Sequence, residues 1–221
     1  MRLSELAATS ERVGQTSKRT EKLKLLAACI AGAPAAERGL AVLYLSGAIA
    51  QSKLGVGYAQ LGALRDQAPA ETANLALSDV HAALDEIAAV RGAGSAGRRL
   101  ELLRGLLARA AAPEQKFLVR LLLGELRQGA LESLVLDALG DAAGVSRAVV
   151  RRAQMLIGDL AQVAQLAFES GEAGLAAAGL QVFRPVQPML ADSAQDVAEA
   201  LERLGTAVFE YKLDGARVQA H

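Results

Sequence analysis

Residues 210–217 contain the group of side chains with the clearest chemical potential. Glu210, Lys212, Asp214 and Arg217 follow one another closely, and Gly215 completes an Asp-Gly pair. In an extended strand Glu210 and Lys212 point to the same face, and Asp214-Gly215 is a strong signal for a two-residue turn. A hairpin closed there puts Arg217 opposite Lys212, where two like charges repel each other unless they share an anion. A phosphate is the natural anion for this pair.

The same arrangement predicts a reactive amine at Lys212. A lysine becomes a nucleophile only after its amine loses a proton, and a neighbouring arginine together with partial loss of water lowers the lysine pKa. We therefore expect Lys212 to attack the anion that Arg217 holds. An ordinary Asp-Gly hairpin with exposed charges is the alternative for these residues.

The elements that must position this motif are mostly helices. Aromatic residues make up only 3% of the 221 residues and Trp is absent, while Ala, Leu, Arg and Glu are abundant, which favours helices. Apolar residues at helical spacing, interrupted by Gly and Pro, predict the helices 17–31, 36–46, 58–66, 78–90, 97–111, 114–127, 131–139, 147–157 and 159–169. The expected fold class is mainly α.

The character of the chain changes near residue 180. An extended, Pro-containing segment is followed by a short acidic helix over 194–204 and by strand-like alternation over 206–213. We expect a multi-helix domain over 1–178, a linker over 179–193, and over 194–221 the first helix and strands of an α+β domain.

Composition excludes several classes of protein. The single Cys29 excludes a disulfide framework, and with only two His it also excludes a zinc site. The uncharged runs are shorter than the roughly 18 apolar residues of a membrane span, so no membrane association is expected. The start of the chain lacks an apolar signal segment, so the expected compartment is the cytoplasm.

The net charge of zero would argue against a nucleic-acid partner, but it is an average over unlike segments. Residues 1–24 carry six basic and three acidic side chains, and residues 144–152 carry three basic and no acidic ones. A basic face on a neutral protein is therefore available.

Several basic side chains share helical faces. Lys116, Arg120 and Arg127 fall within a stripe about 40° wide on the predicted helix 114–127, and Lys18 and Lys22 are one turn apart. Such a stripe suits a phosphate backbone, and it also suits plain solvent.

Further candidates lie at the starts of helices. Arg147 and Arg151 share a face of a helix that Ser146 can cap. Gly129 precedes a helix whose free backbone amides could receive a phosphate. Gly55 and Gly57 indicate a tight turn that approaches a phosphate or a neighbouring helix, not a dinucleotide fingerprint.

The motif at 210–217 resembles the nucleotidyltransferase signature of ATP-dependent DNA ligases. The resemblance implies that Lys212 attacks the α-phosphate of ATP and becomes AMP-lysine. It also implies that Glu210 recognises adenine, that Arg217 contacts the bound nucleotide, and that Asp214 has a positioning role.

The resemblance extends over nearly the whole chain. The runs that resemble the helical DNA-binding domain of these ligases and its junction with the adenylation domain are 16–22, 43–47, 54–57, 116–121, 124–129, 158–160 and 184–191. This implies a monomeric protein that binds the backbone and minor groove of nicked duplex DNA, with ATP as cofactor. It also implies Mg²⁺, with ligands beyond residue 221, so the chain alone should bind DNA without sealing nicks.

Two alternatives remain open. RNA ligases and capping enzymes use the same lysine motif, although their usual layout lacks a large helical domain before the lysine. A helical scaffold without a nucleic-acid role, with an accidental motif, is the other alternative.

Overall fold

Helices make up all the regular structure in the part of the chain that the structure describes, residues 1–126, 132–187 and 193–208. In this computed structural model the described residues form twelve α-helices and one 3-10 turn. They are α1 (Leu3–Gln15), α2 (Arg19–Gly32), the 3-10 turn η1 (Ala35–Glu37), α3 (Arg38–Leu45), α4 (Tyr58–Gly62), α5 (Leu77–Ala89), α6 (Ser95–Arg109), α7 (Ala112–Leu122), α8 (Glu132–Ala143), α9 (Arg147–Ile157), α10 (Leu160–Glu169), α11 (Gly171–Ala176) and α12 (Val197–Leu204). The mainly α prediction is confirmed for these residues.

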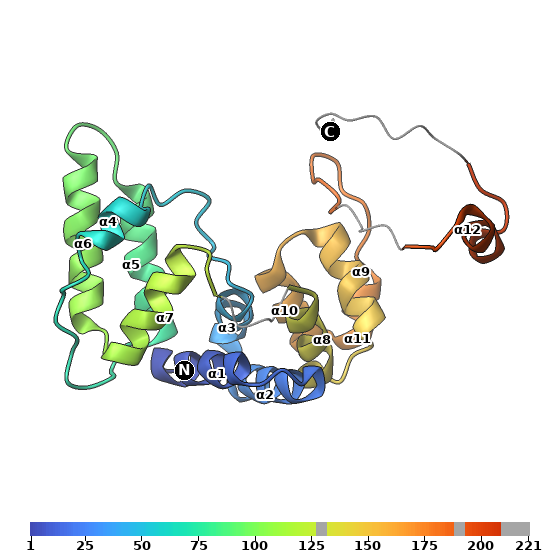
Figure 1. Cartoon of the computed structure of the whole chain (residues 1–221), viewed down its shortest axis with the longest axis horizontal. Helices are drawn as coiled ribbons and strands as arrows, with labels where there is room; N and C mark the ends of the chain where they lie inside the picture. The colour runs from blue at the N-terminus through green and yellow to red at the C-terminus, as the bar shows by residue number, and fades with distance from the viewer. Residues whose placement is uncertain (127–131, 188–192, 209–221) are drawn as a thin grey trace.

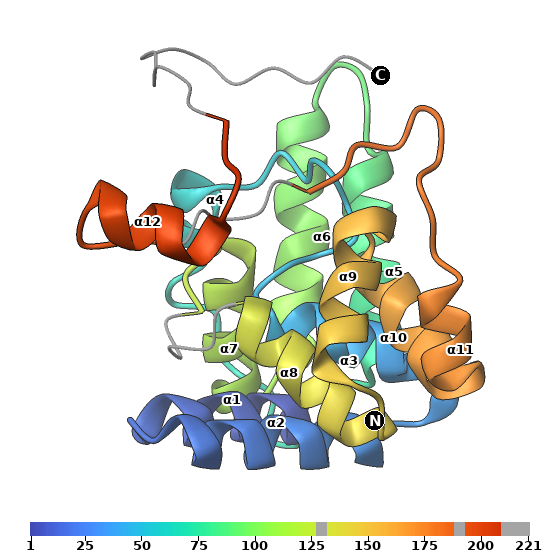
Figure 2. The ribbon, with the colours of Figure 1, turned by 90° about the vertical axis from the view of Figure 1, so that its right-hand side faces the viewer.

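The helices lie in two groups joined by a long pair. In Figure 1, α4–α7 lie at one end and α8–α11 at the other, and α1 and α2 run side by side beneath both groups. Helix α1 contacts α7, whereas α2 packs on α8, and α3 packs on α10. Figure 2, turned by 90°, shows α8 and α9 rising above the α1–α2 pair. The α1–α2 pair therefore contacts both groups of helices.

One continuous apolar core runs through both groups. Leu26 and Ile30 of α2 and Tyr44 of α3 are fully buried in it. Cys29 is half-buried and packs against this core. Burial raises the pKa of its thiol, which a hydrogen bond with Thr9 partly offsets. The core thus holds the thiol in its neutral form.

Several helices begin with the same local device. The side chains of Glu5, Gln60, Asp79 and Glu114 each accept a hydrogen bond from a backbone N–H three residues earlier, at distances of 2.8 to 3.1 Å. These bonds satisfy a backbone donor that a helix start would otherwise leave unpaired. The starts of α1, α4, α5 and α7 are therefore set by local sequence.

Some predicted boundaries were wrong. Helix α7 ends at Leu122 and not at residue 127, because Gly124 adopts a left-handed φ of 67° and the N–H of Glu125 donates to the carbonyl of Arg120 at 2.8 Å. Helix α8 continues to Ala143, beyond the predicted residue 139, and the turn comes at Gly144. Helices α1 and α11 were not predicted, and α4 is shorter than expected.

The segment after residue 193 lies apart from the two groups. No residue of α12 is buried, and Val197 and Leu204 are exposed apolar side chains. Its start is capped by Asp196, whose carboxylate accepts from the N–H of Glu199 at 2.8 Å. The predicted strand over 206–213 does not begin by Val208, and its remaining residues lie outside the described part of the chain. The predicted domain boundaries stay predictions.

None of the helices described by the structure combines the length and apolar character needed to cross a bilayer.

Helices α3 and α10 approach closely because Gly39 lacks a side chain. A Cβ on Gly39 would lie 3.1 Å from the Cβ of Ala161 and 3.2 Å from its carbonyl oxygen. The guanidinium of Arg38 lies 4.1 Å from the centre of the Phe168 ring and joins the same two helices. Gly105 on α6 differs, because a Cβ there would meet nothing within 4 Å.

These two glycines give a matched prediction about stability. Gly39→Val should lower the free energy of unfolding by about 2 kcal/mol, since the new side chain would push α3 from α10. Gly105→Ala should raise it by about 0.5–1 kcal/mol, since alanine restricts the unfolded chain and suits a helix. Urea unfolding of both variants checks this, and equal effects of the two would contradict the proposed close contact.

Candidate nucleic-acid interface

Two facing helices, α8 and α9, carry arginines and aspartates in matching positions. Arg147 and Arg151 lie one turn apart on α9, and Asp137 and Asp141 lie one turn apart on α8. Arg147 Nε and Nη2 donate to the two oxygens of Asp141 at 2.8 and 2.7 Å. Arg151 donates to Asp137. The two pairs therefore form parallel rungs between the helices.

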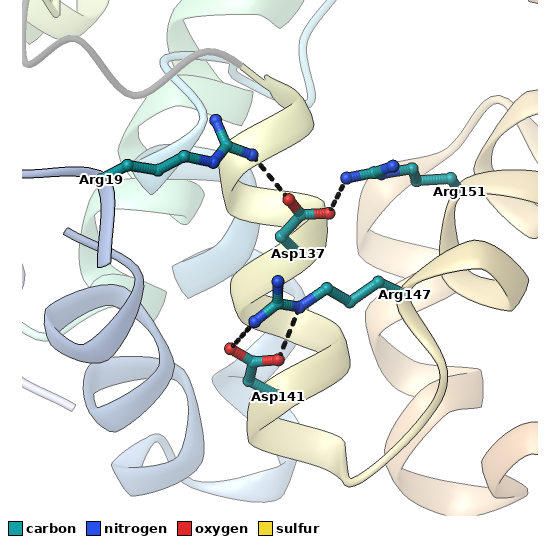
Figure 3. Close-up of polar contacts among 5 residues, drawn as sticks. All are labelled: Arg19, Asp137, Asp141, Arg147 and Arg151. Atoms are coloured by element: carbon teal, nitrogen blue, oxygen red, sulfur yellow. Dashed lines mark hydrogen bonds and ion pairs between the residues drawn. The ribbon is translucent and has the colours of Figure 1, made fainter. Parts of the chain in front are cut away.

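Asp137 also receives a second arginine, from a different helix. Arg19, the first residue of α2, donates to Asp137 Oδ2 at 2.7 Å, while Arg151 takes Oδ1. Figure 3 shows the two guanidinium groups reaching the carboxylate from opposite sides. We name the group of Arg19, Asp137 and Arg151 the arginine–aspartate cluster. It ties α2, α8 and α9 together.

Burial within this cluster is uneven. The Asp137 side chain is only 2% exposed, whereas those of Arg19 and Arg151 are 60% and 52% exposed. A carboxylate this deep needs cationic partners, because an unpaired buried charge is costly. The cluster therefore shows solvent a surface of guanidinium groups with a net charge of plus one.

The second rung, formed by Arg147 and Asp141, differs from the cluster because both of its side chains are partly exposed. Arg147 and Asp141 are 45% and 36% exposed, and their mutual hydrogen bonds raise the pKa of Arg147. Exposed ion pairs contribute little stability. This rung therefore orients Arg147 more than it stabilises the fold.

The third arginine of α9 has a structural task. Arg152 donates to the carbonyls of Ala176 and Ala178 at 3.3 and 3.1 Å, which satisfies the end of α11. The predicted cap by Ser146 was wrong, because its side chain makes no cap bond. The Ser146 N–H donates instead to Glu172 at 3.1 Å.

The predicted basic stripe is partly present on α7. Lys116 lies 65% exposed with its Nζ 3.4 Å from Glu11 of α1, and Arg120 Nε donates to the carbonyl of Glu125 at 3.4 Å. Arg120 is half-buried. Lys116 thus joins α7 to α1, whereas Arg120 bonds to the turn that follows α7. The α1–α2 pair connects this junction to the arginine–aspartate cluster.

Lys18 and Lys22 do not form an exposed pair. Lys18 is exposed at the N-cap of α2, whereas Lys22, one turn later, is only 9% exposed. Arg19, which lies between Lys18 and Lys22 in the sequence, is a further exposed cation on α2 that the sequence analysis did not select.

The structure explains glycine at position 55, whereas no contact within the described residues requires it at position 57. Gly55 has a φ of 66°, and a Cβ there would lie 2.9 Å from the guanidinium of Arg99 on α6. The Gly57 N–H donates to Gln60 at 3.1 Å and starts α4. Arg99 of α6 therefore lies beside Gly55, and a phosphate contact at this turn stays a prediction.

The remaining predicted site residues lie outside the described part of the chain. They are Arg127, Gly129, Glu210, Lys212, Asp214 and Arg217. Sequence reasoning missed Arg19 and Asp137. The available signal was Asp137 itself, since one acidic residue within the otherwise apolar run 134–139 requires a cationic partner.

The described helices α2 and α9 thus expose guanidinium groups on connected elements. The family described as DNA ligase N terminus matches residues 61–140, which extend from α4 into α8.

Over its whole length the chain is similar to proteins named probable DNA ligase. It is 49% identical to one from Anaeromyxobacter sp. (strain Fw109-5) and covers 43% of that protein. It is 50% identical to one from Anaeromyxobacter dehalogenans (strain 2CP-1 / ATCC BAA-258), of which it covers 44%. A match from Mycolicibacterium vanbaalenii is 49% identical over 99% of the chain and 40% of the relative.

These matches relate the chain to the N-terminal part of probable DNA ligases, and it spans less than half the length of those relatives. The resemblance to DNA ligases is confirmed at this level.

The unequal burial of the two rungs predicts unequal losses of stability. Replacing Arg19 and Arg151 together by Ala should cost about 2–3 kcal/mol, because Asp137 is left buried without its cations. Arg147→Ala should cost less than about 1 kcal/mol, because its rung is solvated. Thermal unfolding followed by circular dichroism measures both, and a larger loss for Arg147→Ala would overturn the assignment.

Proposed function

We propose that this chain supplies the DNA-gripping part of an ATP-dependent DNA ligase, together with the lysine that accepts AMP. The observation that carries the proposal is the occurrence of Glu210, Lys212, Asp214 and Arg217 in one motif within a chain related throughout to probable DNA ligases. The motif at residues 210–217 alone would support only the general assignment to a nucleotidyltransferase. The helical part before it favours duplex DNA as the partner.

The proposed binding surface contacts the DNA backbone. Exposed cations on α2, α7 and α9 neutralise phosphates, and they carry no information about base sequence. Arg127 and Gly129 are proposed as further contacts of the same kind. Binding should therefore be weakly selective for sequence and strongly dependent on salt.

The proposed chemistry begins at Lys212. Its deprotonated Nζ attacks the α-phosphate of ATP, a phosphorus–nitrogen bond forms, and the bond to pyrophosphate breaks. AMP then moves to the 5′-phosphate of the nick, and the 3′-hydroxyl displaces it. Glu210 recognises adenine, Arg217 contacts the nucleotide, and Asp214 positions the loop.

The proposal assigns no Mg²⁺ ligand to these residues. Within the described ranges there is no group of three or more His, Cys, Asp or Glu that could hold a metal ion. In the complete enzyme Mg²⁺ would neutralise the phosphates of ATP.

Covalent labelling tests the chemistry. The complete protein should acquire one AMP from ATP labelled at the α-phosphate, and Lys212→Ala should abolish the labelling because no other amine takes its place. Lys53→Ala, which changes an exposed lysine before α4, is the matched control and should label normally. An unlabelled wild type, or full labelling of Lys212→Ala, would refute the proposed reaction.

The affinity for nicked duplex DNA tests the proposed DNA-binding surface. Lys116→Ala with Arg120→Ala should weaken binding by about tenfold and make the dependence on salt shallower by about one unit per lost phosphate contact. Arg98→Ala with Arg104→Ala on α6 is the control and should change affinity less than about twofold, since charges away from the contact act weakly through salt. Unchanged affinity in the first variant would favour a scaffold, and a preference for nicked RNA would favour an RNA ligase.

A further inference from the structure

Asp137 holds more positive charge than its own neutralisation needs. One arginine would balance one carboxylate, yet Arg19 and Arg151 both bond to it from separate helices (Figure 3). A buried ion pair is in itself weak evidence for stability, because the loss of water from the charges offsets much of their attraction. The second arginine therefore calls for a further explanation.

The geometry of the cluster favours the recognition of an anion. Each guanidinium is a planar group with several N–H donors, and the bond to Asp137 uses one donor from each arginine. Both heads are more than half exposed. Two arginines and one aspartate leave a net charge of plus one, which is the complement of one phosphodiester.

We propose that Asp137 is a positioning residue that holds Arg19 and Arg151 together so that the two arginines bind one phosphate of the DNA backbone. The proposal rests on the proposed function of the chain as a DNA binder. Free arginine side chains lose much rotamer freedom when they bind a ligand. Asp137 removes that cost in advance, because its own position is fixed by the apolar core around α8.

The second rung supports the same surface. Arg147 lies one turn from Arg151 on α9 and is held by both oxygens of Asp141. In Figure 3 its side chain reaches from α9 across α8, below the cluster. The surface therefore offers a third oriented guanidinium beside the proposed phosphate position.

The substitution Asp137→Asn separates positioning from simple electrostatics by the sign of its effect. Removing a negative charge from a DNA-binding face normally strengthens binding, because the protein becomes more positive. If Asp137 positions the arginines, the same substitution weakens binding by about tenfold, since the amide keeps a single acceptor oxygen and can no longer hold both arginines. Glu11→Gln is the matched control, because it also removes one acid beside a proposed contact, Lys116. It should leave affinity unchanged or tighter.

Fluorescence anisotropy with a labelled nicked duplex, at several salt concentrations, gives the readout. A cycle of Asp137→Asn, Arg151→Ala and the double variant should be non-additive, because Asp137 acts through Arg151. Arg19→Lys and Arg151→Lys preserve the charge and lose the planar group, so each should weaken binding by about threefold or more. Thermal unfolding establishes which variants are folded.

The outcomes separate this proposal from the proposed function. Salt-dependent binding by the wild type, with equal or tighter binding by folded Asp137→Asn, overturns the positioning role alone. If Asp137→Asn does not fold, unchanged affinity in both lysine variants overturns it. A wild-type chain that shows no salt-dependent binding overturns the proposed grip on DNA and this proposal together.

Discussion

The burial of one carboxylate determines how the basic surface of this protein is arranged. Asp137 lies in the middle of α8 among fully buried apolar residues, where a charge without partners would destabilise the fold. The two arginines that satisfy it come from α2 and α9. Their long side chains consequently meet over α8, although their positions in the sequence are far apart. A requirement of the core thus sets the positions of charges at the surface.

The apolar core and the basic surface are built from the same helices. Helix α9 buries Val150 and Ala153 and presents Arg147 and Arg151 to α8. Helix α7 buries Phe117 and Leu118 and presents Lys116. Because these basic side chains are attached to packed helices, the core fixes the backbone positions from which they extend. This is the property that a binder of a regular backbone requires.

Most helices could be predicted from the sequence, because apolar spacing and glycine stops are local signals. The end of α7 was mispredicted, because the apolar pattern continues past Leu122 and outweighed the stop signal of Gly124, whose left-handed conformation ends the helix. Lys22 was beyond prediction. Its spacing from Lys18 suggests a shared exposed face, but packing of α2 on neighbouring helices leaves only Lys18 exposed.

In the candidate site too, local sequence patterns predicted some residues, whereas others depend on tertiary packing. Lys116, Arg147 and Arg151 were identified because charges repeat at helical spacing. Arg19 escaped, because its partner Asp137 is distant in sequence and only tertiary packing unites them. The chemistry of Lys212 stays a prediction from its motif.

The aspartates within the arginine rungs have a consequence for how long a DNA molecule would stay bound. Each carboxylate offsets one positive charge and stays with the protein, so the rungs bring less net positive charge to a duplex than three free arginines would. Contacts between such arginines and phosphates would carry no information about base sequence. Residence at a given place on a duplex would then have to come from a feature of that place.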